Sequence, residues 1–296
     1  MGAWGAGLYS SDSALDLKAS IRALVRLPFD GKRMLELLRT LNAAADDPGD
    51  EEHTEFWLVA ADQFARHGVR CDEARDRAIK IIQGGTDIKV MRELGMSAAD
   101  LRRREKKLSE LAGELKAPLS PSKAKTLKEP EPLLLAAGSV WAYPTMKRKA
   151  RNPYFETPES EQFSADGWGA LITLAVGRAF DWLAWYAVAP VALQAKTKPR
   201  MAEVRNSRFY LDQIAHREPS AAPPILGGVG TLSRTHIKRL GLESIGDAKL
   251  SSKKLLPHDI DSSGQTSAVN DISFSNYLDA SQASADGPSV AEFLEA

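Results

Sequence analysis

Residues 116–144, KAPLSPSKAKTLKEPEPLLLAAGSVWAYP, contain the change of pattern that decides the fold class. Prolines, lysines and serines fill residues 117–132, where few apolar side chains are available for burial, so we expect a linker there. Before it, apolar residues recur at helical spacing, and after it β-forming residues lead to a proline. The stretch therefore predicts an α+β protein with two different domains.

The residues before the linker predict a helical bundle. Short loops join segments whose apolar residues recur every three to four positions, which favours antiparallel neighbours. Serine or aspartate precedes several of these segments, where its side chain can accept hydrogen bonds from the first helical turn. We expect helices near residues 12–27, 31–41, 51–67, 72–83 and 98–115.

Residues 133–258 predict a small, strongly curved β-sheet or barrel with a short helix. Strands are expected up to Pro144, over residues 167–176, and from residue 182 to a stop near Pro190. Glycines interrupt these strands, which favours strong curvature. A long polar loop is expected over residues 145–166, and a short helix over residues 235–240 between Ser233 and Gly241.

Charge is distributed unevenly along the chain. Residues 116–254 hold 21 Lys and Arg against 12 Asp and Glu, whereas residues 255–296 hold no Lys or Arg and seven acids. Residues 259–296 therefore predict an acidic, largely flexible tail, with residues 274–278 as a more apolar exception. Two alternatives stay open: the tail is solvated, or it lies on the basic surface and competes with an acidic partner.

The N-terminal opening sets a tryptophan among glycines. Glycine permits tight, irregular backbone, and a large apolar ring beside it can be held in a groove. We expect a structural latch in which Trp4 is buried against the helix of residues 51–67, with Tyr9 beside it. The residues assigned to this latch are Trp4, Gly5, Gly7, Tyr9, Asp12, Phe56 and Trp57.

Two resemblances add to these patterns. The opening MGAWGAGLYSSDSALD, with FWLVAADQF at 56–64 and AIKIIQGG at 78–85, resembles an uncharacterised bacterial family that begins Met-Gly-(Ala/Thr)-Trp-Gly-x-Gly. The second half is similar to β-rich domains among immunity proteins of bacterial polymorphic toxin systems, through GSVWAYP at 138–144 and GALITL at 169–174. Ser139 replaces the usual acid, and residues 145–166 are inserted between the two strands. This second resemblance implies a protein that masks a toxin.

The motifs of common catalytic sites are missing from the sequence. The five histidines are scattered without zinc-protease spacing, and the single Cys71 permits no internal disulfide. GGVGT at 227–231 lacks the Lys-Ser/Thr of a phosphate-binding loop, so phosphate binding and a flexible connector stay open as alternatives. We predict no catalytic residues, no metal and no cofactor.

One segment suggests binding. The basic run of residues 147–151 lies between Tyr143 and Tyr154, and cations flanked by aromatic rings can bind phosphates and stack bases. An acidic protein partner and a plain solvated loop are the other interpretations. Trp185 belongs to an aromatic cluster for which a place in the core is the other interpretation, and as an exposed ring it is expected to help cover a partner. The predicted binding residues are Lys147, Arg148, Lys149, Arg151, Tyr154, Phe155 and Trp185.

These observations predict a cytoplasmic, non-catalytic binding protein of bacterial conflict systems, immunity-like, which occludes a partner protein such as a toxin or a neighbouring-gene product. The sequence shows no secretory leader pattern and no apolar stretch long enough for a bilayer, so no membrane partner is expected. The alternatives are a nucleic-acid-binding accessory protein using residues 147–151, and an enzyme of unrecognised type. We expect a helical domain (1–116), a linker (117–132), a β-rich domain (133–258) and the tail (259–296).

Overall fold

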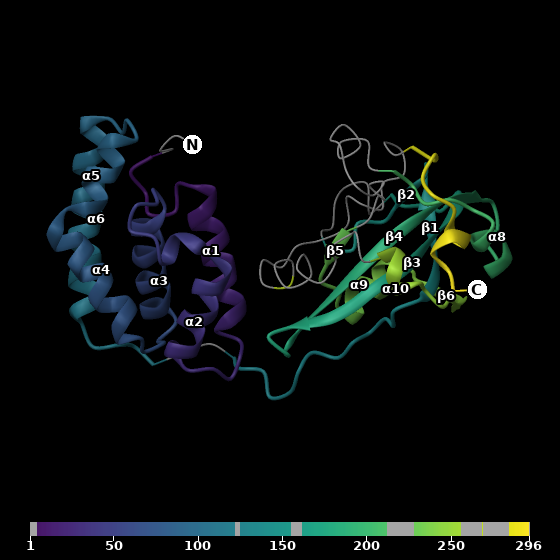
Figure 1. The fold of residues 1–296 in the computed structure, drawn as a ribbon, viewed down its shortest axis with the longest axis horizontal. Coiled ribbons are helices and arrows are strands. Elements are labelled where there is room, and N and C mark those ends of the chain that lie inside the picture. Colours follow the sequence, from purple (N-terminus) through teal and green to yellow (C-terminus); the bar gives the residue numbers. More distant parts are fainter. Residues whose placement is uncertain are drawn as a thin grey trace. The chain divides into compact units, whose positions relative to one another are not determined.

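In the computed structural model, the chain forms two compact units, residues 1–128 and residues 129–296 (Figure 1). The structure describes residues 5–121, 125–154, 162–211, 228–255, 268 and 284–295. The first unit is helical, and the second is built on an antiparallel sheet with short helices. The predicted α+β class is therefore confirmed. The boundary between the units falls inside residues 117–132, where a linker is predicted.

Helix α3 is the centre of the helical unit. Every residue of α3 from Thr54 to Phe64 is buried, because α1, α4, α5 and α6 all contact this helix. The elements of the unit are α1 (Asp12–Leu24), α2 (Gly31–Leu41), η1 (Ala43–Ala45), α3 (His53–Arg66), α4 (Asp72–Gly84), α5 (Thr86–Glu93) and α6 (Ala98–Lys116).

The helix starts follow the predicted caps. The side chains of Ser11, Asp30 and Ser97 each accept a hydrogen bond from a backbone N–H of the first turn that follows. Helix α5 is not predicted by the sequence. It begins directly after Gly85, which has a left-handed backbone (φ 63°), and no side chain caps its first turn. A short helix without a capping residue leaves little local pattern to recognise.

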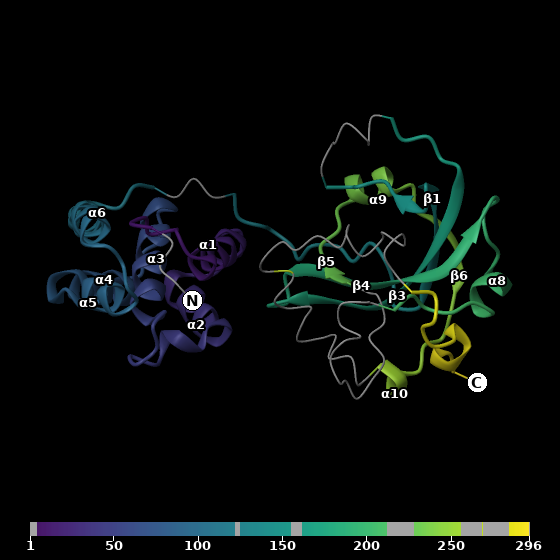
Figure 2. The same ribbon diagram turned by 90° about the horizontal axis from the view of Figure 1, so that it is seen from above.

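The second unit is a curled antiparallel sheet (Figure 2). Its strand order is β2-β1-β3-β4-β5, with β6 also paired to β1. One face carries an apolar cluster that includes Tyr143, Leu171 and Tyr186, and Leu240 of α9 packs into it. The elements are β1 (Ser139–Met146), β2 (Lys149–Ala150), β3 (Gly167–Ala179), β4 (Leu183–Ala195), α8 (Met201–Arg205), β5 (Gly228–Gly230), α9 (Arg234–Leu240), β6 (Glu243–Asp247), α10 (Ser252–Leu255) and η6 (Val290–Phe293).

Two prolines do not end their strands as predicted. Pro190 lies within β4 opposite Leu171, and its carbonyl oxygen is turned away from β3 to accept from Tyr210 N at 3.4 Å. The ring nitrogen is turned the same way, so the β3–β4 ladder loses no donor. The nitrogen of Pro144 likewise faces the edge away from β3, where β6 pairs only to Ala142 and β2 only from Thr145 onward.

Three further segments differ from the prediction. Strand β3 continues to Ala179, beyond its predicted end at residue 176, and Phe180 and Asp181 form the turn to β4 in left-handed backbone (φ 52° and 65°). Gly228–Gly230 pairs with β4 as β5, so these residues form a strand and not a flexible connector. Residues 145–150, predicted within a long loop, form the end of β1, a two-residue turn and β2.

The end of the acidic tail is packed, which corrects the expectation of a flexible segment for residues 284–295. Val290 and Phe293 are 1% and 5% exposed, and the Phe293 ring meets Phe209 edge-on at 5.3 Å. Phe209 pairs with Val191, on the sheet face opposite the one that α9 covers. The described end of the tail therefore does not lie over α9 (Figure 2). Residues 274–278 lie outside the described part.

Candidate binding surface

The predicted basic run forms the tip of a tight β-hairpin. Thr145 pairs with Ala150 and Met146 with Lys149, which leaves Lys147 and Arg148 as the two turn residues. Both have positive φ, 52° and 68°, as a type I′ turn requires. Asp166 stabilises the turn, because its carboxylate oxygens accept from the backbone N–H of Lys147 at 3.0 and 3.1 Å. Asp166 bonds only to the backbone of Lys147, and the Lys147 side chain is exposed.

The chain after the hairpin runs along α9. The Tyr154 hydroxyl donates to the carbonyl oxygen of Thr231 at 2.7 Å, and its ring lies 4.5 Å from the His236 ring. Arg239 Nη1 donates to the carbonyl oxygen of Pro153 at 3.2 Å. These contacts hold the segment that follows the hairpin against α9, a helix that carries further cations. Sequence spacing could not predict this neighbour, because more than 80 residues separate the two segments.

We call the combined surface the basic face. Its hairpin residues Lys147, Arg148 and Lys149 are exposed, as are Arg234 and Lys238 of α9. The basic face consists of Lys147, Arg148, Lys149, Arg151, Arg234, Lys238 and Arg239. The cations of α9 were missed from sequence, although Ser233 and Gly241 correctly mark the start and end of that helix.

The aromatic residues predicted for binding differ in their exposure. Trp185 is 4% exposed, and its ring lies over Gly177, where any side chain would overlap it. Trp185 is therefore a core residue, which corrects its assignment to an exposed surface. Tyr154 is half-buried against α9. Phe155 lies outside the described residues.

The N-terminal segment from Gly5 to Ser11 fastens to the helical unit through polar contacts. The Tyr9 hydroxyl donates to the buried carboxylate of Asp62, and burial together with that carboxylate raises the pKa of Tyr9. The carbonyl oxygen of Gly7 accepts from Arg104 Nη1 at 3.0 Å, and the Ser11 hydroxyl donates to Glu55 at 2.6 Å. The segment borders a cavity of about 350 Å³ beside α3 and α6.

Of the residues assigned to the latch, Tyr9 lies on α3 as expected, beside Asp62. Phe56 and Trp57 are buried in the same helix, at 1% and 0% exposure. Asp12 is the exposed first residue of α1, and the preceding Ser11 caps that helix. The position of Trp4 lies outside the described residues, so its burial stays a prediction.

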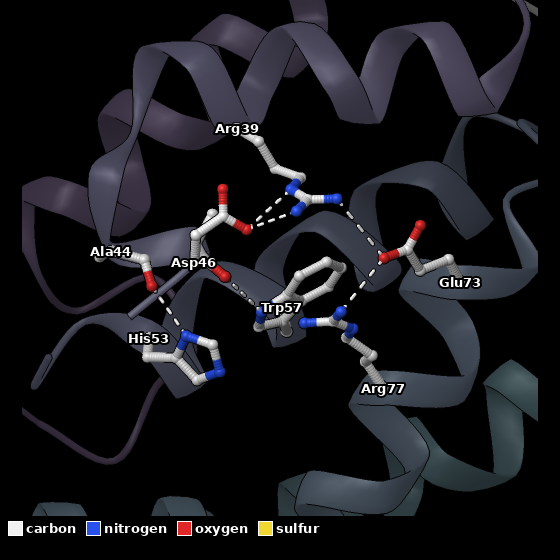
Figure 3. A network of polar contacts seen from close by, with 8 residues as sticks. Arg39, Ala44, Asp46, His53, Trp57, Glu73 and Arg77 are labelled. Atoms are coloured by element: carbon white, nitrogen blue, oxygen red, sulfur yellow. Dashed lines mark hydrogen bonds and ion pairs between the residues drawn. The ribbon is translucent and has the colours of Figure 1, made fainter. Parts of the chain in front are cut away.

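A second polar cluster joins α2, α3 and α4 (Figure 3). The Arg77 guanidinium stacks 4.2 Å above the buried Trp57 ring, and Trp57 Nε1 donates to the carbonyl oxygen of Ala45 at 3.1 Å. Glu73 lies between Arg77 and Arg39, at 3.4 and 3.7 Å. Each charged group already has an opposite charge or a ring as its partner, which is typical of a structural clasp between helices.

Cys71 has the environment of a packed thiol. Burial raises its pKa, which keeps the sulfur protonated and lowers its reactivity as a nucleophile. Among the described residues, no group of three or more His, Cys, Asp or Glu side chains is arranged to hold a metal ion. Within that same part of the chain, every helix is too short or too polar to traverse a bilayer.

Comparisons with protein-family models, with curated proteins and with solved structures found no match for this chain. The resemblances of the opening and of the second half therefore stay predictions, and the surface just described is the basis for a function.

Proposed function

We propose that the chain is a non-catalytic binding protein of bacterial conflict systems, immunity-like, that covers an acidic surface of a partner protein with the basic face. The observation that carries this proposal is the hairpin tip. Two adjacent cations, Lys147 and Arg148, occupy left-handed backbone where Asn-Gly is the unstrained choice. Such backbone costs about 1–2 kcal/mol for each residue other than glycine. Strain retained at an exposed, charged tip is typical of a site with a function.

The rigid backbone of the basic face supports binding. Asp166 holds the turn, and Tyr154 and Arg239 hold the following segment against α9. A surface that is already ordered loses less conformational entropy on association than a mobile loop. Lysine and arginine on such a surface steer an acidic partner and raise the association rate, and they do so most at low salt.

The aromatic residues favour a protein partner over a nucleic acid. Binding to single strands without sequence preference relies on rings on which bases can stack. The Tyr154 ring packs on His236 and its hydroxyl is bonded to Thr231, whereas Trp185 is buried. These described rings therefore make contacts within the fold and do not offer an open face on which a base could stack.

The test is co-expression of the chain with the product of each adjacent gene. We expect one product to inhibit growth alone and to form a stable complex with this chain that restores growth. The triple variant Lys147→Glu, Arg234→Glu and Lys238→Glu should lose the complex and the rescue. The matched control Lys32→Glu, Lys80→Glu and Lys89→Glu changes the net charge equally at exposed helical positions and should keep both. Absence of any complex or rescue, or equal effects of both variants, contradicts the proposal.

Fluorescence anisotropy with generic DNA and RNA oligonucleotides at low salt tests the alternative. We expect no saturable binding to either probe. Tight binding that the Lys147, Arg234 and Lys238 reversals abolish would replace the protein partner with a nucleic acid.

A further inference from the structure

The tail segment, residues 284–295, binds the β unit as a strand-like stretch, residues 284–289, followed by the 3-10 turn η6 (Val290–Phe293). Its backbone bonds to the chain at residues 207–211 on one side and at residues 249–251 on the other. Phe209 N donates to Pro288 O at 3.0 Å, and Val290 N donates to Ser207 O at 3.0 Å. Ser251 N donates to Phe293 O at 2.8 Å. The pairing of residues 284–289 with residues 208–211 resembles strand addition, in which main-chain bonds supply affinity for an added segment.

Three buried positions give this contact its specificity. Gly287, Val290 and Phe293 are buried, three residues apart, whereas Ala291 and Glu292, between the last two of them, are exposed. A side chain at Gly287 would overlap the carbonyl oxygen of Phe209, so only glycine fits there. Phe293 fills the last position against the Phe209 ring. The surface accepts a small residue, then an aliphatic and then an aromatic residue at equal spacing.

Charge adds to this selection. The exposed side chains of the tail segment include Asp286, Glu292 and Glu295, and the segment has no lysine or arginine. The residues that receive it include Arg208, whose Nη1 donates to the carbonyl oxygen of Gly287 at 2.7 Å, and Lys249. Basic residues beside an acidic peptide favour its approach and its orientation.

We propose that residues 207–211, with the Phe209 ring, and residues 249–251 form a peptide-binding groove that the chain's own tail fills in cis. The groove takes an acidic segment of a partner protein with the pattern Gly-Pro-x-Val-x-x-Phe, which ends in one 3-10 turn as residues 287–293 do. Displacement of the tail opens the groove. This second surface lies on the sheet face opposite α9 and does not depend on the function proposed for the basic face.

The test uses a fluorescein-labelled peptide of residues 284–295 and a chain that ends at Ala283. By fluorescence anisotropy, the shortened chain should bind the peptide in a saturable manner. The full chain should bind it at least about 100-fold more weakly, because the tethered tail competes at a high effective concentration. Reversal of Lys147, Arg234 and Lys238 in the shortened chain should leave peptide binding unchanged, which separates this proposal from that for the basic face.

Peptide variants test the assigned positions. Gly287→Ala and Phe293→Ala peptides should lose binding, because the first introduces an overlap and the second removes the ring from its site. The matched control Ala291→Ser alters an exposed position and should bind like the parent peptide. If the shortened chain is unfolded by circular dichroism, the full chain with Gly287→Ala and Phe293→Ala serves as the acceptor.

Two results overturn the proposal. The first is a folded acceptor that does not bind the peptide, or that binds the Gly287→Ala and parent peptides equally. The second is a full chain that elutes as a dimer in light scattering and becomes a monomer on Phe293→Ala, because a second copy would then fill the groove.

Discussion

Arg104 and Asp87 are opposite charges inside the helical unit, with side chains only 2% and 1% exposed. Arg104 donates through Nε and Nη2 to both carboxylate oxygens of Asp87, at 2.6 and 2.9 Å, and through Nη1 to Gly7. The pair therefore links α5, α6 and the N-terminal segment. A buried ion pair adds little over apolar packing, but a single buried charge without its partner is costly.

Asp87→Ala should therefore lower the free energy of unfolding of the helical unit by about 3–5 kcal/mol, since Arg104 loses its counter-charge in the interior. Urea unfolding followed by circular dichroism measures the change. The exposed substitution Lys106→Ala on the same helix as Arg104 is the control and should stay within about 0.5 kcal/mol of the parent. Equal effects of the two substitutions would contradict a structural role for the pair.

Glu55 is the buried acid whose titration should be visible in stability. Burial raises its pKa, against the opposing effects of the Ser11 hydroxyl and Arg104, while Glu52 and Asp87 also face it and raise it further. The folded state thus holds the Glu55 proton more tightly than the unfolded state. Its contribution to stability grows as pH falls through the folded pKa and is lost as pH rises above it.

Glu55→Gln should raise the urea midpoint at pH 7, because it removes the ionised form and keeps an oxygen that accepts from Ser11. The gain should shrink as pH falls from neutrality toward the usual glutamate value of 4.5. Urea midpoints across this range for the parent, Glu55→Gln and the exposed control Glu105→Gln provide the measurement. A gain that does not depend on pH, or one shared by the control, would show that Glu55 titrates normally.

At the scale of elements, the β1–β2 hairpin places two cationic residues in a strained backbone conformation. Its pairing leaves only Lys147 and Arg148 for the turn, and the right-handed twist of the strands requires positive φ at both. Lysine and arginine therefore disfavour the backbone conformation of this turn. Asp166, which lies outside the hairpin, stabilises the turn by accepting from the backbone N–H of Lys147. Stability and binding are expected to conflict in this hairpin.

Replacing the turn with Asn-Gly, as Lys147→Asn with Arg148→Gly, should stabilise the β unit by about 1 kcal/mol, since these residues tolerate positive φ. The same variant should weaken binding of the partner, because two tip cations are lost. Thermal unfolding and pull-down of the co-expressed partner measure the two effects. Lys147→Gln with Arg148→Gln removes the charges and keeps the strain, so it should weaken binding without raising the melting temperature. A stabilisation shared by both variants would show that charge repulsion, and not backbone strain, limits the hairpin.

At the scale of the whole molecule, each unit contains its own apolar interior. In the helical unit, Leu58 packs with Leu108 and Leu111, and in the β unit Leu171 packs with Tyr186 and Leu240. The ends of the linker join different units: Leu127 N donates to Arg26 O at 2.7 Å, and Glu131 N donates to Trp182 O at 2.9 Å. A boundary at residue 128 keeps both contacts within their own unit.

Residues 1–128 and residues 129–296, expressed separately, should therefore each fold. The sum of their circular dichroism spectra should match the spectrum of the full chain, and each should unfold cooperatively. A first fragment shortened to residues 1–121 loses the Leu127–Arg26 contact and should melt at a lower temperature than residues 1–128. A disordered spectrum for either fragment would mean that its core depends on the other unit.

Local pattern was sufficient where a single segment contains all the information. Ser11, Asp30 and Ser97 cap the helices that follow them, and Gly241 ends α9 with left-handed backbone (φ 65°), because capping bonds form between near neighbours. The change from helical spacing to β-forming residues across 116–144 was enough to predict the α+β class.

Other features depended on pairing between distant segments, which spacing does not encode. Pro144 and Pro190 lie inside strands because their missing N–H groups face edges where no ladder bond is needed. The exposed cations of residues 147–149 were identified from sequence, but α9 joins them only through contacts across the fold. Trp185 was misassigned because the sequence does not reveal that Gly177 lies opposite and receives its ring.

The sequence by itself thus determined the fold class, most helix starts and the basic charge of the middle region, since these depend on residues close together in the chain. Only the tertiary structure decided which strands continue through a proline, which aromatic rings are buried, and that the end of the acidic tail packs behind Phe209. These outcomes depend on which partners the folded sheet brings within reach, and burial of Val290 and Phe293 outweighs the polar composition around them.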